Sequence, residues 1–134
     1  MSVGILIITH AKVGDALIET ADKMLGGLPL AVQVMPIPLD CEPDNSVEQA
    51  LERIQALDKG DGVLVLTDMF GSTPSNVANH LLNRKGVCVI TGVNLPMLIR
   101  VLNYPRLNLE ELSQKAVSGG IDGIMQCKKK DESS

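Results

Sequence analysis

His10 and Asp68 are the residues whose types and positions could perform chemistry in this chain. One apolar run, residues 3–8, ends near His10, and another, residues 63–66, ends near Asp68. A neutral imidazole keeps one nitrogen as donor and one as acceptor, so a carboxylate that holds the N–H leaves the other nitrogen free as a nucleophile or base. We predict that Asp68 orients His10 in this way and stabilises the cation formed when the free nitrogen is phosphorylated. The alternative is a histidine that only ends its strand.

The segment after Asp68 has the residues of an anion-binding site. Gly71 permits a tight turn, and Thr73 followed by Pro74 is typical of a helix N-cap and first residue. A helix start directs unpaired N–H groups and a partial positive charge outward, which suits a phosphoryl group. Ordinary helix capping is an alternative with the same geometry. Hydroxyl groups for this site would come from Thr9, Ser72, Thr73 and Ser75.

Two further polar residues have both a functional and a structural interpretation. Asn94 follows a fourth apolar run and is either a ligand of the phosphoryl group or the N-cap of the next helix. His80 lies in the middle of a predicted helix without a partner in view, and we interpret it as a surface residue.

The elements that must position these residues alternate along the chain. Strands are expected over residues 3–10, 30–39, 63–68 and 87–91, with a candidate fifth strand over 121–128. Helices are expected over residues 13–25, 44–57, 74–82 and 108–118, with a short one that ends at residue 102. The second would start between Asp44 and Ser46, with Asn45 and Glu48 at capping-box spacing. Gly26-Gly27 should end the first helix, and the last should open at Asn108 and end at Gly119-Gly120. This alternation predicts a single α/β domain over residues 1–134, with a doubly wound parallel sheet in which the first and third strands are neighbours. His10 and Asp68 would then meet at the carboxyl ends of those strands.

Composition excludes several other classes of function. A net charge of −4 disfavours nucleic acid, because phosphate binding depends on clustered Lys and Arg. One Phe, one Tyr and no Trp offer few faces for a flavin or a stacked base. The three cysteines show no metal-ligand spacing, which predicts no metal site and a reducing compartment. The first apolar run is too short to span a bilayer, and no signal-peptide pattern surrounds it. We expect a cytoplasmic protein without a cofactor or membrane insertion.

Three segments together resemble the mannose-family IIA domain of the bacterial phosphoenolpyruvate:sugar phosphotransferase system. They are Ile-Thr-His at residues 8–10, Asp-Met-Phe-Gly-Ser-Thr-Pro-Ser-Asn at 68–76 and Gly-Val-Asn-Leu-Pro-Met at 92–97. The resemblance covers essentially the whole chain, and its motifs occur in order at the three expected loops. It implies a flavodoxin-like fold and a phosphocarrier.

The resemblance also implies roles and partners. His10 would accept a phosphoryl group from the carrier protein HPr, on Nε2, and donate it to a IIB protein. Asp68 matches the acidic partner of that histidine, and Thr73 matches the hydroxyl residue at the helix start. Family members are homodimers in which the last strand, here residues 121–128, runs antiparallel on the partner's sheet, and covering an exposed edge is a physical reason for this.

The chain departs from the family pattern at two loop positions and at its end. Ala11 and Ser72 stand where many relatives have glycine, which costs roughly 1 kcal/mol at a backbone position that needs a positive φ. No IIB domain follows before Ser134, so we expect the acceptor to be a separate protein. The alternative function is a regulatory phosphoprotein that uses the same His10 chemistry without a role in sugar transport.

Overall fold

The computed structural model describes residues 2–39 and 45–130. The strands are β1 (Gly4–His10), β2 (Val32–Ile37), β3 (Val63–Thr67) and β4 (Val87–Thr91). The helices are α1 (Val13–Leu25), α2 (Ser46–Leu57), α3 (Thr73–His80), the short 3-10 helix η2 (Leu81–Asn83), α4 (Leu95–Leu102) and α5 (Leu109–Asp122).

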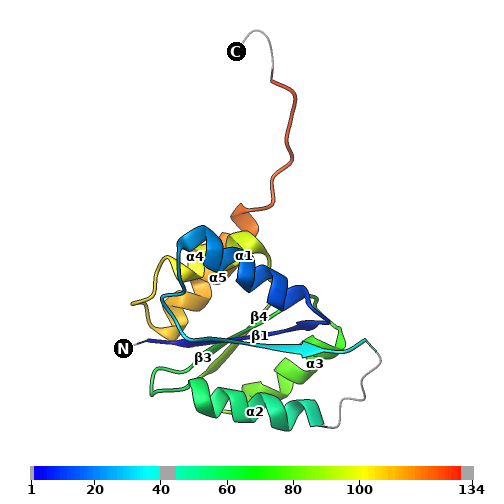
Figure 1. Ribbon diagram of the computed structural model, residues 1–134, viewed down its shortest axis with the longest axis vertical. Coiled ribbons are helices and arrows are strands. Elements are labelled where there is room, and N and C mark those ends of the chain that lie inside the picture. The colour runs from blue at the N-terminus through cyan, green and yellow to red at the C-terminus, as the bar shows by residue number, and fades with distance from the viewer. Residues whose placement is uncertain (1, 40–44, 131–134) are drawn as a thin grey trace.

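The four strands form one parallel sheet in the order β2-β1-β3-β4, which confirms the predicted doubly wound arrangement. Helices α1, α4 and α5 cover one face of the sheet, and α2 and α3 cover the other (Figure 1). Central strand β1 supplies side chains to both cores: Ile5 and Ile7 to the first, Leu6 and Ile8 to the second. Burial on both faces explains why its sequence is a continuous aliphatic run.

The two edges of the sheet are β2 and β4. Pro36 lies in β2, and an edge strand is where a proline is expected, because proline donates no ladder hydrogen bond. β4 is half-buried along its whole length. The sheet therefore has an open edge beside α5.

The C-terminal part of the chain differs from the sequence-based expectation. We predicted that Gly119-Gly120 ends the last helix, and this is wrong, because α5 continues to Asp122. The two glycines instead allow α5 to approach α4: a Cβ at Gly119 would lie 2.7 Å from Cβ of Arg100, and one at Gly120 would lie 2.9 Å from Cε of Met97.

The candidate fifth strand is absent from the described part of this single chain. Ile121 and Asp122 belong to α5, Gly123 is its C-cap, and residues 124–130 have no regular structure and lead away from the fold (Figure 1). An exchanged strand requires a second copy of the chain, so that part of the prediction stays untested.

The helix ends match the predictions in part. Gly26 ends α1 with a left-handed φ of 70°, and Asn108 caps α5 by accepting a hydrogen bond from Glu111 N–H at 2.9 Å, both as expected. The N-cap of α3 is Ser72, one residue before the predicted Thr73. Asn45 precedes α2 but its side chain makes no capping hydrogen bond. The predicted helix start at Asp44, like Cys41, lies outside the described residues.

Within residues 2–39 and 45–130, no helix combines the length and apolar character needed to cross a membrane.

Candidate functional site

The structure brings His10 and Asp68 together at the carboxyl edge of the sheet. His10 is the last residue of β1, and Asp68 directly follows β3, the neighbouring parallel strand in register with it. His10 Nδ1 lies 2.9 Å from Asp68 Oδ2, and the backbone N–H of His10 donates to the same oxygen at 3.0 Å. One carboxylate oxygen therefore holds both the backbone and the ring of the histidine.

This contact selects one tautomer of the imidazole. An ionised carboxylate only accepts hydrogen bonds, so Nδ1 carries the ring proton and Nε2 keeps its lone pair. The side chains of His10 and Asp68 are 27% and 14% exposed. The histidine is thus fixed by its buried side and remains accessible from outside.

The helix α3 begins beside this pair. Gly71 has a left-handed φ of 80°, and a Cβ there would meet no atom within 4 Å, so its conformation rather than crowding favours glycine. Asn76 N–H donates to Ser72 O at 2.8 Å as the first intrahelical bond, which leaves the N–H groups of Thr73 and Ser75 without an intrahelical acceptor. Exposed Thr73 thus stands at a helix start suited to an anion.

Three buried polar atoms accompany the site. Thr67 Oγ1, Asp68 Oδ1 and Ser75 Oγ have no hydrogen-bond partner among the described residues. Thr67 and Asp68 lie at the end of β3, and Ser75 lies in the first turn of α3. Buried polar groups are normally paired. The three unpaired atoms therefore place unused hydrogen-bonding capacity at the carboxyl ends of the strands.

Thr9 is placed differently from the expected phosphoryl ligand. It is fully buried, and its Oγ1 accepts a hydrogen bond from Gly14 N–H at 2.7 Å. Successive strand residues point to opposite faces, so Thr9 and His10 diverge. A Cβ at Gly14 would lie 2.9 Å from that hydroxyl, which explains the glycine. Thr9 fixes the start of α1 instead of facing a ligand.

The loop after His10 contains the backbone strain that the sequence suggested. Ala11 has a φ of 41°, the one positive φ of a non-glycine residue in the described ranges, and its N–H donates to Ile37 O at 2.8 Å. Ser72 has a φ of −88° and no such strain. Of the two positions where many relatives have glycine, only that of Ala11 has a backbone conformation that favours glycine.

Comparison with known proteins identifies the family. Residues 4–117 match the EIIA-man family, described as the PTS system fructose IIA component. The chain belongs to this family. It is 32% identical over 137 residues to the PTS system mannose-specific EIIAB component of Escherichia coli K12, covering 97% of this chain and 41% of that protein. The chain therefore spans about two fifths of that relative.

Two other similarities are to a transcriptional regulator and to a solved structure. The transcriptional regulatory protein LevR of Bacillus subtilis is 30% identical over 126 residues, which cover 90% of this chain and 13% of LevR. The mannose/sorbose-specific IIA subunit from Enterococcus faecalis superposes with a TM-score of 0.86 at 20% identity, covering 98% of both chains. The latter shows that the two share a fold.

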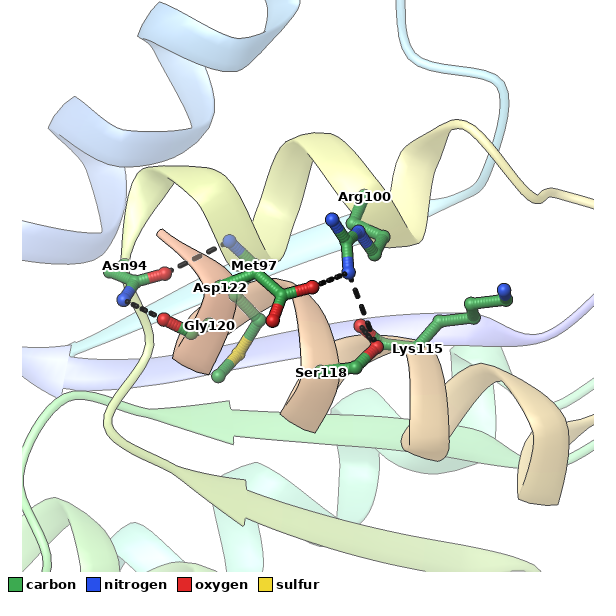
Figure 2. A network of polar contacts seen from close by, with 7 residues as sticks. All are labelled: Asn94, Met97, Arg100, Lys115, Ser118, Gly120 and Asp122. Carbon is green, nitrogen blue, oxygen red and sulfur yellow. Dashed lines mark hydrogen bonds and ion pairs between the residues drawn. The ribbon is translucent and has the colours of Figure 1, made fainter. Parts of the chain in front are cut away.

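Asn94 of this EIIA-man protein caps α4. Its Oδ1 accepts a hydrogen bond from Met97 N–H at 2.9 Å, and its Nδ2 donates to Gly120 O at 3.2 Å (Figure 2). Both ends of the amide are thus engaged within the protein. This geometry fits the capping interpretation of Asn94, and the contact with α5 has no signal in the sequence.

Sequence reasoning also missed two exposed apolar residues next to the site. Met69 and Phe70, directly after Asp68, are 59% and 78% exposed. Phe70 is the single phenylalanine of the chain. An apolar pair inside a polar loop was the available signal. His80, by contrast, is exposed on α3, as predicted.

Proposed function

We propose that this EIIA-man protein is a phosphocarrier of the sugar phosphotransferase system, with His10 as the phosphoryl acceptor. The donor is the phosphorylated histidine of HPr, and the acceptor is a IIB protein or domain, both met in the cytoplasm. The observation that carries the proposal is the double hydrogen bond of Asp68 Oδ2 to His10 Nδ1 and to the His10 backbone N–H. It leaves Nε2 as the nucleophile.

The transfer step balances without an added acid or base. The Nε2 lone pair of His10 forms the new N–P bond while the N–P bond of the donor breaks, and that electron pair returns to the donor nitrogen. The His10 ring, protonated at Nδ1, becomes cationic, and the Asp68 carboxylate at 2.9 Å stabilises that charge. Positioning and electrostatics are sufficient for such a reaction.

The start of α3 would bind the phosphoryl oxygens. We assign this role to the loop of Gly71 and Ser72 and to the N–H and hydroxyl groups of Thr73, which follow Asp68 directly. Exposed Met69 and Phe70 would contact the partner proteins and exclude water around the transferred group. The assignment requires no metal or cofactor.

We propose that the protein acts as a homodimer that exchanges residues of the C-terminal segment. A groove of about 330 Å³ lies between β4 and α5, lined by residues that include Ile90, Met97 and Val117. Ile124 and Met125 are 76% and 80% exposed in the single chain. Pairing this segment of one copy with strand β4 of another would cover the groove and the two exposed apolar side chains.

The dimer can be tested by measuring mass in solution. Light scattering during size-exclusion chromatography is expected to give a dimer for the wild type and a monomer for Ile124→Asp, because a carboxylate cannot enter an apolar groove at low cost. A wild type that stays monomeric at all concentrations would contradict the exchange.

A regulatory phosphoprotein is the second candidate, supported by the similarity to LevR, whose name describes a transcriptional regulator. The two candidates differ in what removes the phosphoryl group. Protein labelled with phosphoenolpyruvate, enzyme I and HPr is expected to carry an acid-labile, alkali-stable phosphate. Adding candidate IIB proteins should then discharge it within seconds. Retention of the label with every IIB protein, together with capture of a partner by one phosphorylation state alone, would favour regulation.

A further inference from the structure

The last turn of α5 and its C-cap, Gly123, pack closely against α4. A Cβ at Gly123 would lie 2.4 Å from Cβ of Pro96, as the glycines at 119 and 120 also crowd α4. Arg100 on α4 donates to Asp122 Oδ2 at 2.7 Å and to Ser118 Oγ at 3.4 Å (Figure 2). The two helices therefore hold one another at the point where the C-terminal segment begins.

Asn94 caps both helices at this junction. Its Oδ1 pairs with Met97 N–H in the first turn of α4, and its Nδ2 pairs with Gly120 O in the last turn of α5. The last four carbonyl groups of a helix have no intrahelical donor, so this amide satisfies an otherwise unpaired acceptor. Figure 2 shows the side chain between the two helix ends.

The backbone around Asn94 leads directly to the His10 site. Val93 N–H, one residue before Asn94, donates to Thr67 O at 2.8 Å. Thr67 is followed by Asp68, whose carboxylate holds His10. Three hydrogen bonds and two peptide links thus connect the end of α5 to the imidazole.

We propose that Asn94 is a positioning residue: by clasping the end of α5 to the loop after β4, it keeps Asp68 in the place that holds His10 in its Nδ1–H tautomer. The effect on phosphoryl transfer rests on the function proposed above, whereas the effect on the tautomer does not. The end of α5, where the C-terminal segment begins, is thereby coupled to the orientation of His10.

The test compares two asparagine N-caps that differ in this clasp. Asn94→Ser keeps a capping oxygen for α4, because serine caps about as well as asparagine, but its side chain is too short to reach Gly120 O. Asn108→Ser is the matched control, since Asn108 caps α5 through Glu111 N–H at the opposite edge of the sheet. Both variants keep a capping oxygen for their helix, and only Asn94→Ser loses the hydrogen bond to Gly120 O.

The readout is the tautomer of His10, observed by long-range ¹H–¹⁵N NMR on the ring nitrogens. The wild type and Asn108→Ser should show the Nδ1–H form, whereas Asn94→Ser should show a mixture of tautomers. Transfer from phospho-HPr should slow about fivefold, the equivalent of one hydrogen bond, with an unchanged half-saturating HPr concentration. If Asn94→Ser unfolds, Asn94→Asp against Asn108→Asp gives the same comparison, because aspartate also caps but cannot donate.

An Asn94→Ser or Asn94→Asp protein that keeps the wild-type tautomer would overturn the proposal. A tautomer shift in a protein whose wild type takes no phosphate from HPr would instead support the clasp and contradict the phosphocarrier function. The two failures are therefore distinguishable.

Discussion

Asp58 and Asp68 lie at opposite ends of the strands of the sheet, Asp58 at the amino ends (the amino edge) and Asp68 at the carboxyl ends (the carboxyl edge), and they use their carboxylates differently. Asp58 follows α2 at the amino edge, where Oδ1 accepts from the N–H groups of Gly60 and Gly62 at 2.9 and 3.1 Å, and Oδ2 accepts from Arg84 at 3.1 Å. Asp68 at the carboxyl edge bonds through Oδ2 to His10, while its buried Oδ1 has no partner in the described residues. The structural carboxylate is fully paired, and the proposed functional one keeps an unused oxygen.

The backbones of the two edges differ in the same way. At the amino edge the left-handed positions are glycines, among them Gly62 with φ of 85°, where a Cβ would lie 2.7 Å from Gly86 O. At the carboxyl edge Ala11 holds a left-handed φ with a side chain. Strain and unmet hydrogen-bonding capacity therefore gather beside His10, which is typical of functional sites.

The largest expected effect comes from the two histidines. His10→Ala should abolish labelling from phosphoenolpyruvate, enzyme I and HPr, because it removes the nucleophilic nitrogen and the other histidine of the sequence, His80, is not next to Asp68 in the predicted mechanism. His80→Ala, an exposed position on α3, should label as the wild type does. Equal labelling of His10→Ala and the wild type would refute the mechanism.

The two aspartates should separate rate from stability. Asp68→Ala is expected to keep the fold but to slow transfer by roughly a hundredfold in a rapid-quench assay, since the ring loses its orientation and its counter-charge. Asp58→Ala should leave the rate within about twofold but lower the free energy of unfolding by about 1–3 kcal/mol, because the N–H groups of exposed Gly60 and buried Gly62 and the Arg84 guanidinium lose their acceptor. Equal transfer rates for Asp68→Ala and the wild type would remove Asp68 from the site.

The pH dependence of stability should identify Asp58 as the structural carboxylate. Its hydrogen bond from Gly60 N–H, followed by those from Arg84 and Gly62, holds the pKa of Asp58 below its ordinary value of 3.8. A lowered folded-state pKa stabilises the fold above the unfolded pKa, and this contribution disappears as the pH falls below 3.8 through the folded value.

Urea unfolding of the wild type and Asp58→Asn over a pH series measures this contribution. The stability difference should be constant above the ordinary pKa and should shrink below it. Asp15→Asn, at an exposed position on α1, serves as the control for removing a surface charge. A difference that does not change with pH would mean that the charge of Asp58 is not what matters.

The smallest expected effect is the relief of strain at Ala11. Ala11→Gly should raise the free energy of unfolding by up to about 1 kcal/mol, because glycine adopts a positive φ without a steric cost. Ser72→Gly, at a φ of −88°, should lower stability or leave it unchanged. Chemical denaturation measures both, and a loss of stability in Ala11→Gly would show that the alanine side chain packs favourably.

Much of the fold and the main pair of the site could be predicted from local pattern. Aliphatic runs alternating with amphipathic segments specify a parallel sheet, and its strand order brings the ends of β1 and β3 together. His10 and Asp68 therefore met as predicted. The prediction failed at Gly119-Gly120, where glycines that usually end a helix serve close packing of α5 on α4.

The sequence by itself determined the doubly wound sheet and the position of His10 beside Asp68, because both follow from periodicity and chain order. Only the tertiary structure decided how individual polar side chains are used. Thr9 turned to Gly14, and Asn94 bridges two helix ends far apart in sequence. A hydroxyl or amide bonds to whatever lies opposite it in space, and long-range packing alone sets that partner.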